Sequence, residues 1–399
     1  MFSVCMISSL HGPYDDRIYW KEALSLKNNG YDVIHITTGE DDLDFVSEHG
    51  IRLIQIKKKR YFRNPYLDIL FRKITFRPDI YKKMFGICEA LRADVYHYHD
   101  IQINRFSRKL KQLSHAPAVI YDVHEDFSDL ILSGQPLNSP VRWLFRLYAN
   151  WLRRWELSRA SNCDFIIAAV DHIYQKFEKM AAYGKAALIF NYTTLQPDTI
   201  HPAEQKKYDA IYCGQINPLR GGMEIARAVV IARKVIPGIK VLLLGPVPDA
   251  QYKKELLDEI EKNNLQDNLI LYGNVPYKEI DAYYQDSRIG LGIFMPVSIF
   301  YYGIQIKTFE YMAFGLPVIC SNFGTIDQII RESGSGITVD PRSPEAISKA
   351  LVTLLTNKEF YNTCSTNGRL AAKNKYNWKT EEAKLLDIYR GLSRLPGNA

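Results

Sequence analysis

Two segments in the second half of the sequence combine cations, a carboxylate and glycines at spacings suited to a diphosphate. The denser one runs from Tyr301 to Ile319, where a short helix should begin near Lys307 and end at Gly315. Backbone N–H groups are unpaired at a helix start, so this start with Lys307 beside it can cradle a diphosphate. Glu310 lies one turn further on the same face, where its carboxylate can accept both hydroxyls of a ribose. The alternative interpretation is an ordinary exposed helix pair of lysine and glutamate.

The second segment runs from Cys213 to Gly222. A strand should end at Gly214, and Arg220 precedes a pair of glycines that opens a helix and lets its start approach an anion closely. The arginine fork can hold two phosphate oxygens at once. Read alone, this loop fits a surface arginine after a turn equally well. Together the two segments predict one diphosphate and ribose site, formed by Gly214, Arg220, Lys307 and Glu310.

Three histidines in the first half fall where strands should end and face a ligand. His97 and His99 stand in one run, and His124 stands in the next. A His-x-His pair can bind a metal, but no third ligand has a convincing spacing and no strand-end loop holds an Asp-x-Asp. We therefore expect no metal site.

The elements that must position these residues alternate between short apolar strands and amphipathic helices, which is typical of parallel βαβ units. Each half opens with a strand, a glycine-bearing turn and a helix, and the polar stretch 196–207 separates the halves. We predict two facing Rossmann-like domains, 1–200 and 201–375, with the ligand cleft between them, and a final helical segment, 376–399, that packs back towards the first domain. The predicted strands are 2–8, 33–37, 52–57, 95–99, 119–124, 165–170, 188–191, 210–214, 240–245, 269–273, 289–294, 317–320 and 336–339.

Composition and charge bound the class of protein. The 399 residues are 47% hydrophobic, which excludes disorder and allows two cores. The six cysteines are widely spaced and several lie in apolar runs, which favours buried thiols in a reducing compartment. No basic leader opens the sequence and no apolar run is long enough to span a bilayer. We expect a soluble or peripherally attached protein that faces the cytoplasm.

Basic residues concentrate in the first half, and they predict an anionic partner. The formal net charge is +7, and a lysine- and arginine-rich stretch runs from Lys57 to Lys83. The segment 142–155 mixes arginines with tryptophan, phenylalanine and leucine at helical spacing. A core helix with a basic solvent face is the commoner source of such a pattern. The nearby basic stretch favours an anionic membrane surface instead.

With these segments in place, nearly the whole chain resembles glycosyltransferase family 4, whose members are retaining enzymes of the GT-B fold. The opening run His11-Gly12-Pro13-Tyr14-Asp15-Asp16-Arg17-Ile18, with Glu22 and 29–33, is similar to the family's acceptor-side start. The segments 155–156, 163–167 and 190–192 resemble its pre-linker strand and asparagine turn. The resemblance implies that His124 contacts the transferred sugar, that Arg220 and Lys307 bind the diphosphate, and that Glu310 binds ribose. The sugar and acceptor side then draws on Gly12, Asp16, His99, His124 and Tyr302.

Two positions and one segment depart from the family pattern. Gln215 stands where a second phosphate-binding arginine is usual, and Tyr302 stands where a glutamate usually contacts the sugar. The segment 324–328 replaces a glycine-pair turn, although its helix start can still offer backbone donors. The identity of the sugar that family members transfer therefore cannot be assumed for this chain.

The resemblance implies a retaining transfer from a nucleotide-diphosphate sugar to a glycan or lipid-linked acceptor, in cell-envelope or extracellular polysaccharide biosynthesis. His124, Arg220 and Lys307 would be the catalytic residues, with neither a metal nor another cofactor, because cationic side chains and helix dipoles stabilise the leaving diphosphate. The expected site of action is the cytoplasm, at the inner face of the cell membrane.

Other functions fit the residues less well. A catalytically silent partner subunit is favoured by Gln215 and Tyr302, whereas a sugar-nucleotide 2-epimerase lacks assignable acid and base residues. A nicotinamide dehydrogenase lacks its glycine-rich turn after either leading strand. A nucleic-acid binder would leave Lys307 and Glu310 unused, so we expect no nucleic-acid partner.

Overall fold

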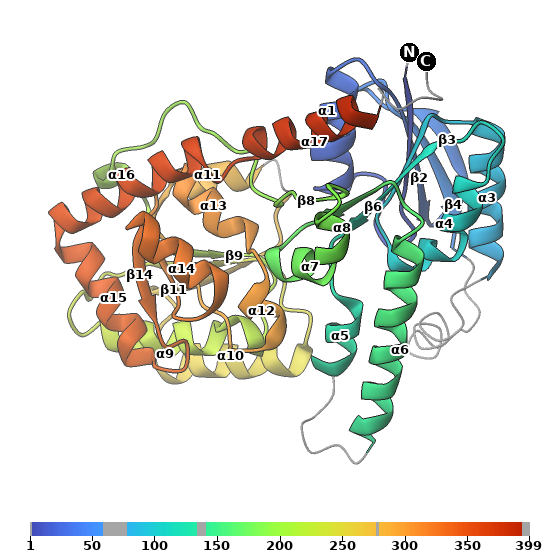
Figure 1. Cartoon of the computed structure of the whole chain (residues 1–399). Helices are drawn as coiled ribbons and strands as arrows, with labels where there is room; N and C mark the ends of the chain where they lie inside the picture. Colours follow the sequence, from blue (N-terminus) through green and yellow to red (C-terminus); the bar gives the residue numbers. More distant parts are fainter. Residues whose placement is uncertain (1, 59–77, 134–140, 277–278, 393–399) are drawn as a thin grey trace. The chain divides into compact units, whose positions relative to one another are not determined.

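The computed structural model describes residues 2–58, 78–133, 141–276 and 279–392, and it divides the chain into two α/β units (Figure 1). Unit 1 comprises the chain up to Asn191 together with the chain from Glu381 onward. Unit 2 comprises Tyr192–Thr380. The division therefore precedes the polar stretch 196–207, and the last helix crosses from one unit into the other.

Unit 1 is built on an eight-stranded sheet in the order β3-β4-β2-β1-β5-β6-β7-β8. All neighbours pair in parallel except β3 and β4, which are antiparallel. The strands are β1 (Ser3–Ile7), β2 (Asp32–Gly39), β3 (Leu43–Val46), β4 (Arg52–Lys57), β5 (Val95–Tyr98), β6 (Ala118–Val123), β7 (Phe165–Ala168) and β8 (Ala186–Leu188).

Helices cover this sheet and bury its apolar side chains in one core. They are the π-helical turn η1 (Ile18–Ala23), α1 (Leu24–Asn28), α3 (Pro78–Leu91), the turn η2 (Ile101–Ile103), α4 (Asn104–Lys111), α5 (Phe127–Ser133), α6 (Arg142–Ala160), α7 (Asp171–Lys176), α8 (Glu178–Ala181) and the later part of α17 (Trp378–Leu392). The tail helix belongs here because Tyr389 is fully buried and its hydroxyl lies 2.9 Å from His97 Nδ1.

Unit 2 is a six-stranded parallel sheet in the order β11-β10-β9-β12-β13-β14, with its own apolar core. Its strands are β9 (Tyr208–Cys213), β10 (Val241–Leu244), β11 (Leu269–Gly273), β12 (Ser287–Gly292), β13 (Val318–Ser321) and β14 (Gly336–Val339). Its helices are η3 (Ala203–Gln205), η4 (Pro218–Arg220), α9 (Gly222–Ala232), α10 (Ala250–Lys262), α11 (Ile280–Gln285), α12 (Ser298–Tyr302), α13 (Ile306–Ala313), α14 (Gly324–Ser333), α15 (Pro344–Thr356) and α16 (Lys358–Asn374).

The sequence pattern missed one strand and shifted another. β3 was not predicted, because its four residues are all exposed and form only a short antiparallel edge, in which Asp44 interrupts the apolar residues. The predicted strand 188–191 ends instead at Leu188, and Ile189 continues as loop. The Ile189 carbonyl accepts a hydrogen bond of 2.9 Å from the Arg17 guanidinium, so this stretch serves a buried polar group instead of extending the sheet.

Each sheet has one place where the strand order reverses, and the predicted site residues follow the strands there. In unit 1 the reversal lies between β1 and β5, and in unit 2 it lies between β9 and β12. Loops that leave the carboxyl ends of such neighbouring strands diverge to opposite faces and leave a crevice for a ligand. The loops after β1 and β9, and the segments after β5 and β12, are therefore the places to look for function.

Two further sequence interpretations concern burial and the membrane. All six cysteines are free and buried, as their apolar surroundings predicted. Across the described ranges, no helix has both the length and the apolar character that crossing a membrane requires.

Candidate functional site

The donor-side residues of unit 2 meet at Gly214, directly after β9. The φ of Gly214 is +121°, a conformation that L side chains rarely adopt. A Cβ atom at Gly214 would lie 2.8 Å from Lys307 Nζ and 3.9 Å from Arg220 Nη1. The structure thus gathers Gly214, Arg220 and Lys307 around one point, although about ninety positions separate the last two in the chain.

The helix that carries Lys307 and Glu310 is fixed through Tyr311. The Tyr311 hydroxyl accepts a hydrogen bond of 2.9 Å from the Cys213 N–H, which joins α13 to the end of β9. The ring of Tyr311 packs so tightly on β12 that a Cβ at Gly290 would lie 2.3 Å from it. Glycine at position 290 therefore allows α13 to approach the sheet closely, and this sets the position of Lys307.

The Lys307 ammonium is buried in an unusual environment for a cation. Among the described residues Nζ has no hydrogen-bond partner, and it lies 3.9 Å from the centre of the Tyr212 ring and 5.4 Å from that of Phe294. Burial and, to a smaller extent, the nearby Arg220 charge lower the pKa of Lys307 to about 7, although Cys213 and Glu310 oppose the shift. A buried ammonium without a hydrogen-bonded acceptor is costly, so an anion at this point would be held strongly.

Glu310 is buried one turn after Lys307, on the same helix. Its Oε2 atom accepts a hydrogen bond of 2.6 Å from the Tyr284 hydroxyl. This bond holds the carboxylate in one orientation. The arrangement suits a carboxylate that accepts hydroxyl groups of a bound ligand.

The helix starts around this point differ in what they can offer. Gly221 has a φ of +63° and leads from the turn η4 into α9, but the Met223 N–H already donates to the Tyr252 hydroxyl at 3.0 Å. Gly324 opens α14 with a φ of +70°, and a Cβ there would lie 2.3 Å from the Tyr301 carbonyl oxygen. Glycine is thus required at both starts by close backbone packing.

The two positions that depart from the family pattern are both accessible. Gln215 is exposed directly after Gly214, and its carbonyl accepts a hydrogen bond of 2.8 Å from the Tyr212 hydroxyl. Tyr302 ends α12 with 47% of its surface exposed. Gln215 therefore helps to place the ring over which Lys307 lies, through its backbone rather than through its side chain.

In unit 1 the loop after β1 is tied to Asp100, which follows β5. The Asp100 carboxylate accepts hydrogen bonds from the N–H groups of Ser9 and Leu10, the second at 3.0 Å, and from the Ser8 hydroxyl at 3.2 Å. Asp100 therefore fixes the turn at the place where the strand order reverses.

The next residues of this turn form a carboxylate–histidine pair. His11 Nδ1 lies 2.9 Å from Asp15 Oδ2, and the Asp15 carboxylate also accepts hydrogen bonds from the backbone N–H groups of Arg17 and Ile18. Burial lowers the pKa of His11, but the hydrogen bond to Asp15 and the nearby carboxylates raise it above its ordinary value overall. The His11 ring centre is 5.3 Å from that of His124. Sequence reasoning listed neither His11 nor Asp15 as a site residue.

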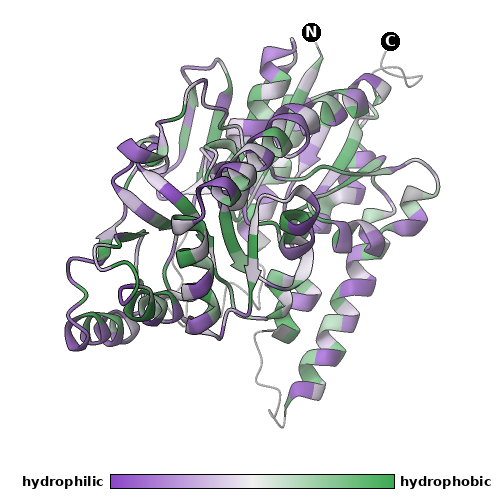
Figure 2. Cartoon of the chain, turned by 90° about the vertical axis from the view of Figure 1, so that its left-hand side faces the viewer, coloured by the Kyte–Doolittle hydropathy of each residue, from purple (hydrophilic) through white to green (hydrophobic). Residues whose placement is uncertain are grey.

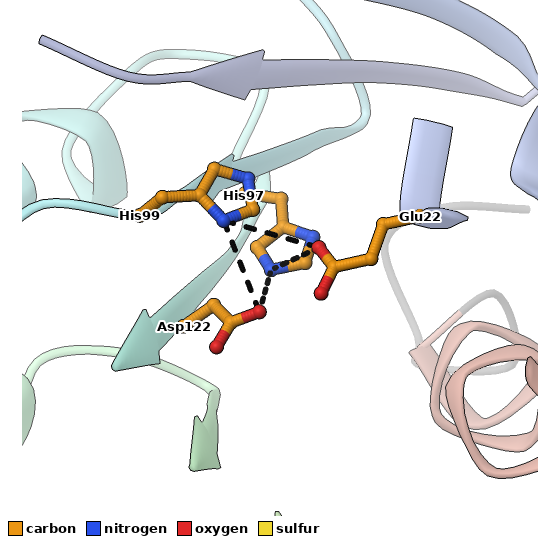
Figure 3. A group of neighbouring side chains, drawn as sticks. All are labelled: Glu22, His97, His99 and Asp122. Atoms are coloured by element: carbon orange, nitrogen blue, oxygen red, sulfur yellow. Dashed lines mark ion pairs between the residues drawn. The ribbon is translucent and has the colours of Figure 1, made fainter. Parts of the chain in front are cut away.

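Behind this pair lies a buried cluster of Glu22, His97, His99 and Asp122 (Figure 3). His97 Nε2 is 3.9 Å from Glu22 Oε2 and 3.8 Å from Asp122 Oδ2, and His99 Nδ1 is 3.8 Å from the same two oxygens. His99 Nδ1 also lies 3.2 Å from His124 Nε2. The cluster therefore connects the interior to His124, whose side chain is 12% exposed.

The Arg17 guanidinium is the cation that both carboxylates of the cluster contact. It lies 2.8 Å from Glu22 Oε1 and 2.9 Å from Asp122 Oδ2, fully within the core. Burial and the charge of Asp122 raise the pKa of Glu22 well above its usual range. Burial would also raise the pKa of Asp122, but Arg17 and His124 hold it well below its usual range.

Burial lowers the pKa of His97 to about 4. Burial and the neighbouring histidines hold the pKa of His99 well below its ordinary value. The two histidines are therefore neutral at neutral pH, and Asp122 is an ionised partner of Arg17. The sequence offered no third metal ligand of convincing spacing beside His97 and His99, but the fold brings Glu22 and Asp122 next to them, and these four side chains form a group that could hold a metal ion. The expectation of no metal site stays a prediction.

The remaining acceptor-side candidates separate into different roles. Asp16 pairs with the buried Lys21 ammonium at 2.6 Å, and the same ammonium donates to Asn191 Oδ1 at 2.7 Å. Asp16 therefore helps to hold the turn in place. Gly12 is exposed, and a Cβ added there would meet no atom within 4 Å, so the fold itself does not require glycine at this position.

A second group of possible metal ligands, Asp126, Asp129 and His172, lies at the start of α5. Asp126 Oδ1 is 3.1 Å from Lys176 Nζ, and His172 Nε2 is 2.9 Å from Asp129 Oδ2. The two carboxylates are therefore already paired with side chains of the protein, Asp126 with Lys176 and Asp129 with His172.

Comparison with known proteins places these sites in a family. Residues 197–371 match the family model described as glycosyl transferases group 1. A GDP-mannose-dependent alpha-(1-6)-phosphatidylinositol monomannoside mannosyltransferase of Mycobacterium tuberculosis is 24% identical over 237 residues, which cover 55% of this chain and 60% of that protein. The chain thus matches less than two thirds of this relative's length.

Two solved structures share the fold over almost the entire chain. Sucrose-phosphate synthase from Thermosynechococcus elongatus superposes with a TM-score of 0.74 at 18% identity and covers 98% of this chain and 99% of its own. HepE from Anabaena, solved with UDP and glucose, gives 0.69 at 12% identity and covers 98% and 100%. Both units therefore have the Rossmann-like folds of GT-B proteins. Residues 197–371, within the second unit, are thus similar to the glycosyl transferases group 1, and the chain as a whole has the GT-B fold.

Proposed function

We propose that this protein transfers a sugar, with retention of configuration, from a nucleotide-diphosphate sugar to a glycan or lipid-linked acceptor. The observation that carries the proposal is the Lys307 ammonium, which is buried beside Gly214 and Arg220 without a hydrogen-bond partner among the described residues. Two cations that converge on a glycine after the central strand of a Rossmann-like sheet are suited to a diphosphate.

The donor half of the reaction follows from this geometry. Arg220 and Lys307 would hold the diphosphate, and Glu310 would accept the ribose hydroxyls in the orientation fixed by Tyr284. As the bond to the sugar breaks, negative charge grows on the leaving diphosphate, and the two cations stabilise it. Side chains thus supply the charge stabilisation that a divalent ion provides elsewhere, and we propose a transfer that needs no metal.

Unit 1 offers polar side chains for the sugar or the acceptor. His124 is partly exposed and is oriented from behind by His99 and Asp122. His11 is oriented by Asp15 and is 31% exposed. Side chains held in this way can position hydroxyl groups for attack, which is a large part of catalysis in a transfer between two bound substrates.

The names of the similar proteins support a sugar nucleotide and a lipid or glycan without identifying either here. The Mycobacterium tuberculosis relative is named for GDP-mannose and a phosphatidylinositol mannoside, and HepE was solved with UDP and glucose. A lipid-linked or polysaccharide acceptor of the cell envelope is the substrate class that we propose. Because an exposed tyrosine, Tyr302, stands where the family usually has a sugar-contacting glutamate, we propose no particular sugar.

The first test is nucleotide binding by calorimetry with UDP, GDP and ADP. Glu310→Ala should weaken the preferred nucleotide by about 1 to 3 kcal/mol, since hydroxyl groups buried at the site would lose their acceptor. Glu255→Ala, which removes an exposed carboxylate from α10 of the same unit, is the control and should leave affinity unchanged. Unchanged affinity in both Glu310→Ala and Lys307→Ala would refute the assignment of the site.

The second test is the reaction itself. Incubation with the preferred nucleotide's sugar conjugates and envelope lipid or glycan fractions should release the nucleoside diphosphate, and the product should keep the donor's anomeric configuration in NMR spectra. Nucleotide binding without any transfer across this panel would favour the silent partner subunit instead.

A further inference from the structure

The helix α6 exposes a stripe of large apolar side chains that the proposed function does not use. Trp143, Leu147 and Trp151 are 59%, 59% and 54% exposed, and they are spaced four residues apart. Leu144 and Tyr148 lie beside them and are 48% and 38% exposed. Residues at this spacing share one face of a helix. A contiguous exposed apolar face of this kind marks an interaction surface.

The opposite face of α6 holds the helix to unit 1. Ala149, Leu152, Glu156 and Ala160 are buried, and Glu156 pairs with Lys176. The first half of the helix extends beyond the sheet of unit 1, and apolar and polar bands alternate along it (Figures 1 and 2). The stripe is thus an outer face of a firmly anchored helix.

The charges of α6 are all of one sign at its surface. The helix contains arginines at 142, 146, 153, 154 and 159, and its only acidic residue is the buried Glu156. At 100° per residue, Arg142, Arg146 and Arg153 fall along one flank of the apolar stripe. The chain also supplies a contrast, since the solvent face of α10 mixes lysines with glutamates and aspartates. Apolar residues flanked by cations characterise helices that lie in the interface of an anionic bilayer.

A pocket opens on the other flank of the stripe, between α4 and α6. It has a volume of about 180 Å³ and is lined by Arg105 of α4 and by Trp151, Leu152, Trp155 and Arg159 of α6. The rings of Trp151 and Trp155 stack with their centres 6.3 Å apart and 18° between their planes. Two guanidinium groups over an aromatic wall suit a phosphate attached to an apolar body.

We propose that α6 docks this protein on an anionic phospholipid bilayer, with a headgroup phosphate in the pocket between Arg105 and Arg159. The stripe from Trp143 to Trp151 inserts at the level of the headgroups, and the arginines contact lipid phosphates around it. The proposal stands apart from sugar transfer, because the same surface would dock a catalytically silent chain. It would also bring a lipid-linked acceptor to unit 1.

The basic stretch 57–83 is not part of this proposal. Most of it lies outside the described residues. Of its described members, Lys57 pairs with Asp41 at 3.1 Å and Lys83 pairs with Asp42 at 2.7 Å. Local carboxylates therefore offset part of its charge, and α6 is the surface to test.

The experiment is co-sedimentation of the full chain with phosphatidylcholine vesicles, with and without phosphatidylglycerol, at low and high salt. Each basic residue near such a surface contributes about fivefold in affinity. Arg105→Gln with Arg159→Gln should therefore weaken binding to the anionic vesicles by roughly twentyfold. The matched control is Lys253→Gln with Lys254→Gln, which removes the same charge from exposed positions on α10 and should change binding little.

A second pair of variants separates the apolar stripe from charge. Leu147→Ser with Trp151→Ser should abolish binding, whereas Leu257→Ser with Tyr272→Ser, at exposed apolar positions in unit 2, should not. In the unchanged protein, lipids brominated near the headgroup should quench tryptophan fluorescence, and this measurement depends on no variant.

Several results would overturn the proposal. They are equal binding to both vesicle types, binding to neither, an equal loss in the control pairs, and absence of quenching. Light scattering that finds a dimer abolished by the Leu147 and Trp151 changes, with no vesicle binding, would assign the stripe to a second copy of this chain instead. Nucleotide affinity is measured on each variant, so that a loss of folding is distinguished from a loss of docking.

Discussion

The buried ammonium of Lys307 makes nucleotide binding depend on pH in a defined direction. Burial lowers the pKa of Lys307 to about 7 in the free protein. A bound diphosphate would favour the charged ammonium and move this pKa back towards the ordinary lysine value of about 10.4. Binding then takes up a proton above neutral pH, so affinity should fall as the pH rises.

The size of the effect follows from the fraction of protein that carries the charge. With a pKa of about 7, half of the free sites are protonated at a pH of about 7 and about one in thirty at a pH of about 8.5. If only the charged form binds well, the dissociation constant should rise by about 16-fold over this interval. The interval lies above the second pKa of a terminal phosphate, which is about 6, so the ligand's own charge stays nearly constant.

The assay is calorimetric titration of the nucleoside diphosphate across this pH interval, with the unchanged protein and three variants compared. Lys307→Met should bind weakly with a flat profile, and Lys307→Arg should also be flat, because an arginine stays charged throughout. Lys358→Met, which removes an exposed lysine of unit 2, should keep the slope of the unchanged protein. A flat profile in the unchanged protein, or an equal slope in Lys307→Met, would show that Lys307 does not bind the diphosphate.

The ligand-free protein supplies an independent check of opposite sign. Because the folded-state pKa of Lys307 lies below its unfolded value, the unfolded chain binds more protons between about pH 7 and 10. This lysine therefore makes the unfolding free energy increase with pH in that window. The difference in unfolding free energy between the unchanged protein and Lys307→Met should show this slope, and saturating nucleotide should remove it.

Three further results are expected. Gly214→Ala should weaken nucleotide binding by about tenfold or more, because the backbone conformation of this residue costs an alanine about 1 to 3 kcal/mol and the added Cβ would crowd Lys307. The control is Gly238→Ala, since a Cβ added at Gly238 meets no atom within 4 Å. Asp122→Asn should lower the unfolding free energy by about 3 to 5 kcal/mol in urea titrations, since it leaves the buried Arg17 without its ionised partner, and a loss below about 1 kcal/mol would contradict this. Sugar transfer should persist in EDTA, and activity that chelation abolishes and magnesium or manganese restores would refute metal independence.

The parallel sheets and the gathering of the donor residues followed from local sequence signals. Alternating apolar runs and helical stretches specify βαβ units, and the order of such units leaves few alternatives for parallel sheets. Gly214, Arg220, Lys307 and Glu310 stand directly beside expected strand ends or helix starts, so their placement could be inferred one loop at a time. The strand β3 was missed because four exposed residues at a sheet edge carry no such signal.

The polar cluster of unit 1 could not be inferred in this way, because most of its contacts join distant parts of the chain. Arg17 meets Asp122 from 105 positions away, and His97 meets Tyr389 from 292 positions away. The sequence does hold one signal, since Arg17, Lys21 and Glu22 stand on the inward face of an otherwise apolar helical turn. Charged residues are rarely buried without partners, so these three required partners that the sequence could not name.

The contrast between the two units indicates how the work is divided between them. In unit 1 the buried Arg17 guanidinium is paired with Asp122, and the histidines of the cluster are held neutral, so the cluster can orient hydroxyl groups without attracting a charged ligand. In unit 2 Lys307 Nζ is buried with no hydrogen-bond partner among the described residues. Such a group lowers the stability of the free protein, and the loss is recovered only when an anion arrives. The same fold, used twice, thus places a buried polar cluster after one central strand and the site that we propose for a diphosphate after the other.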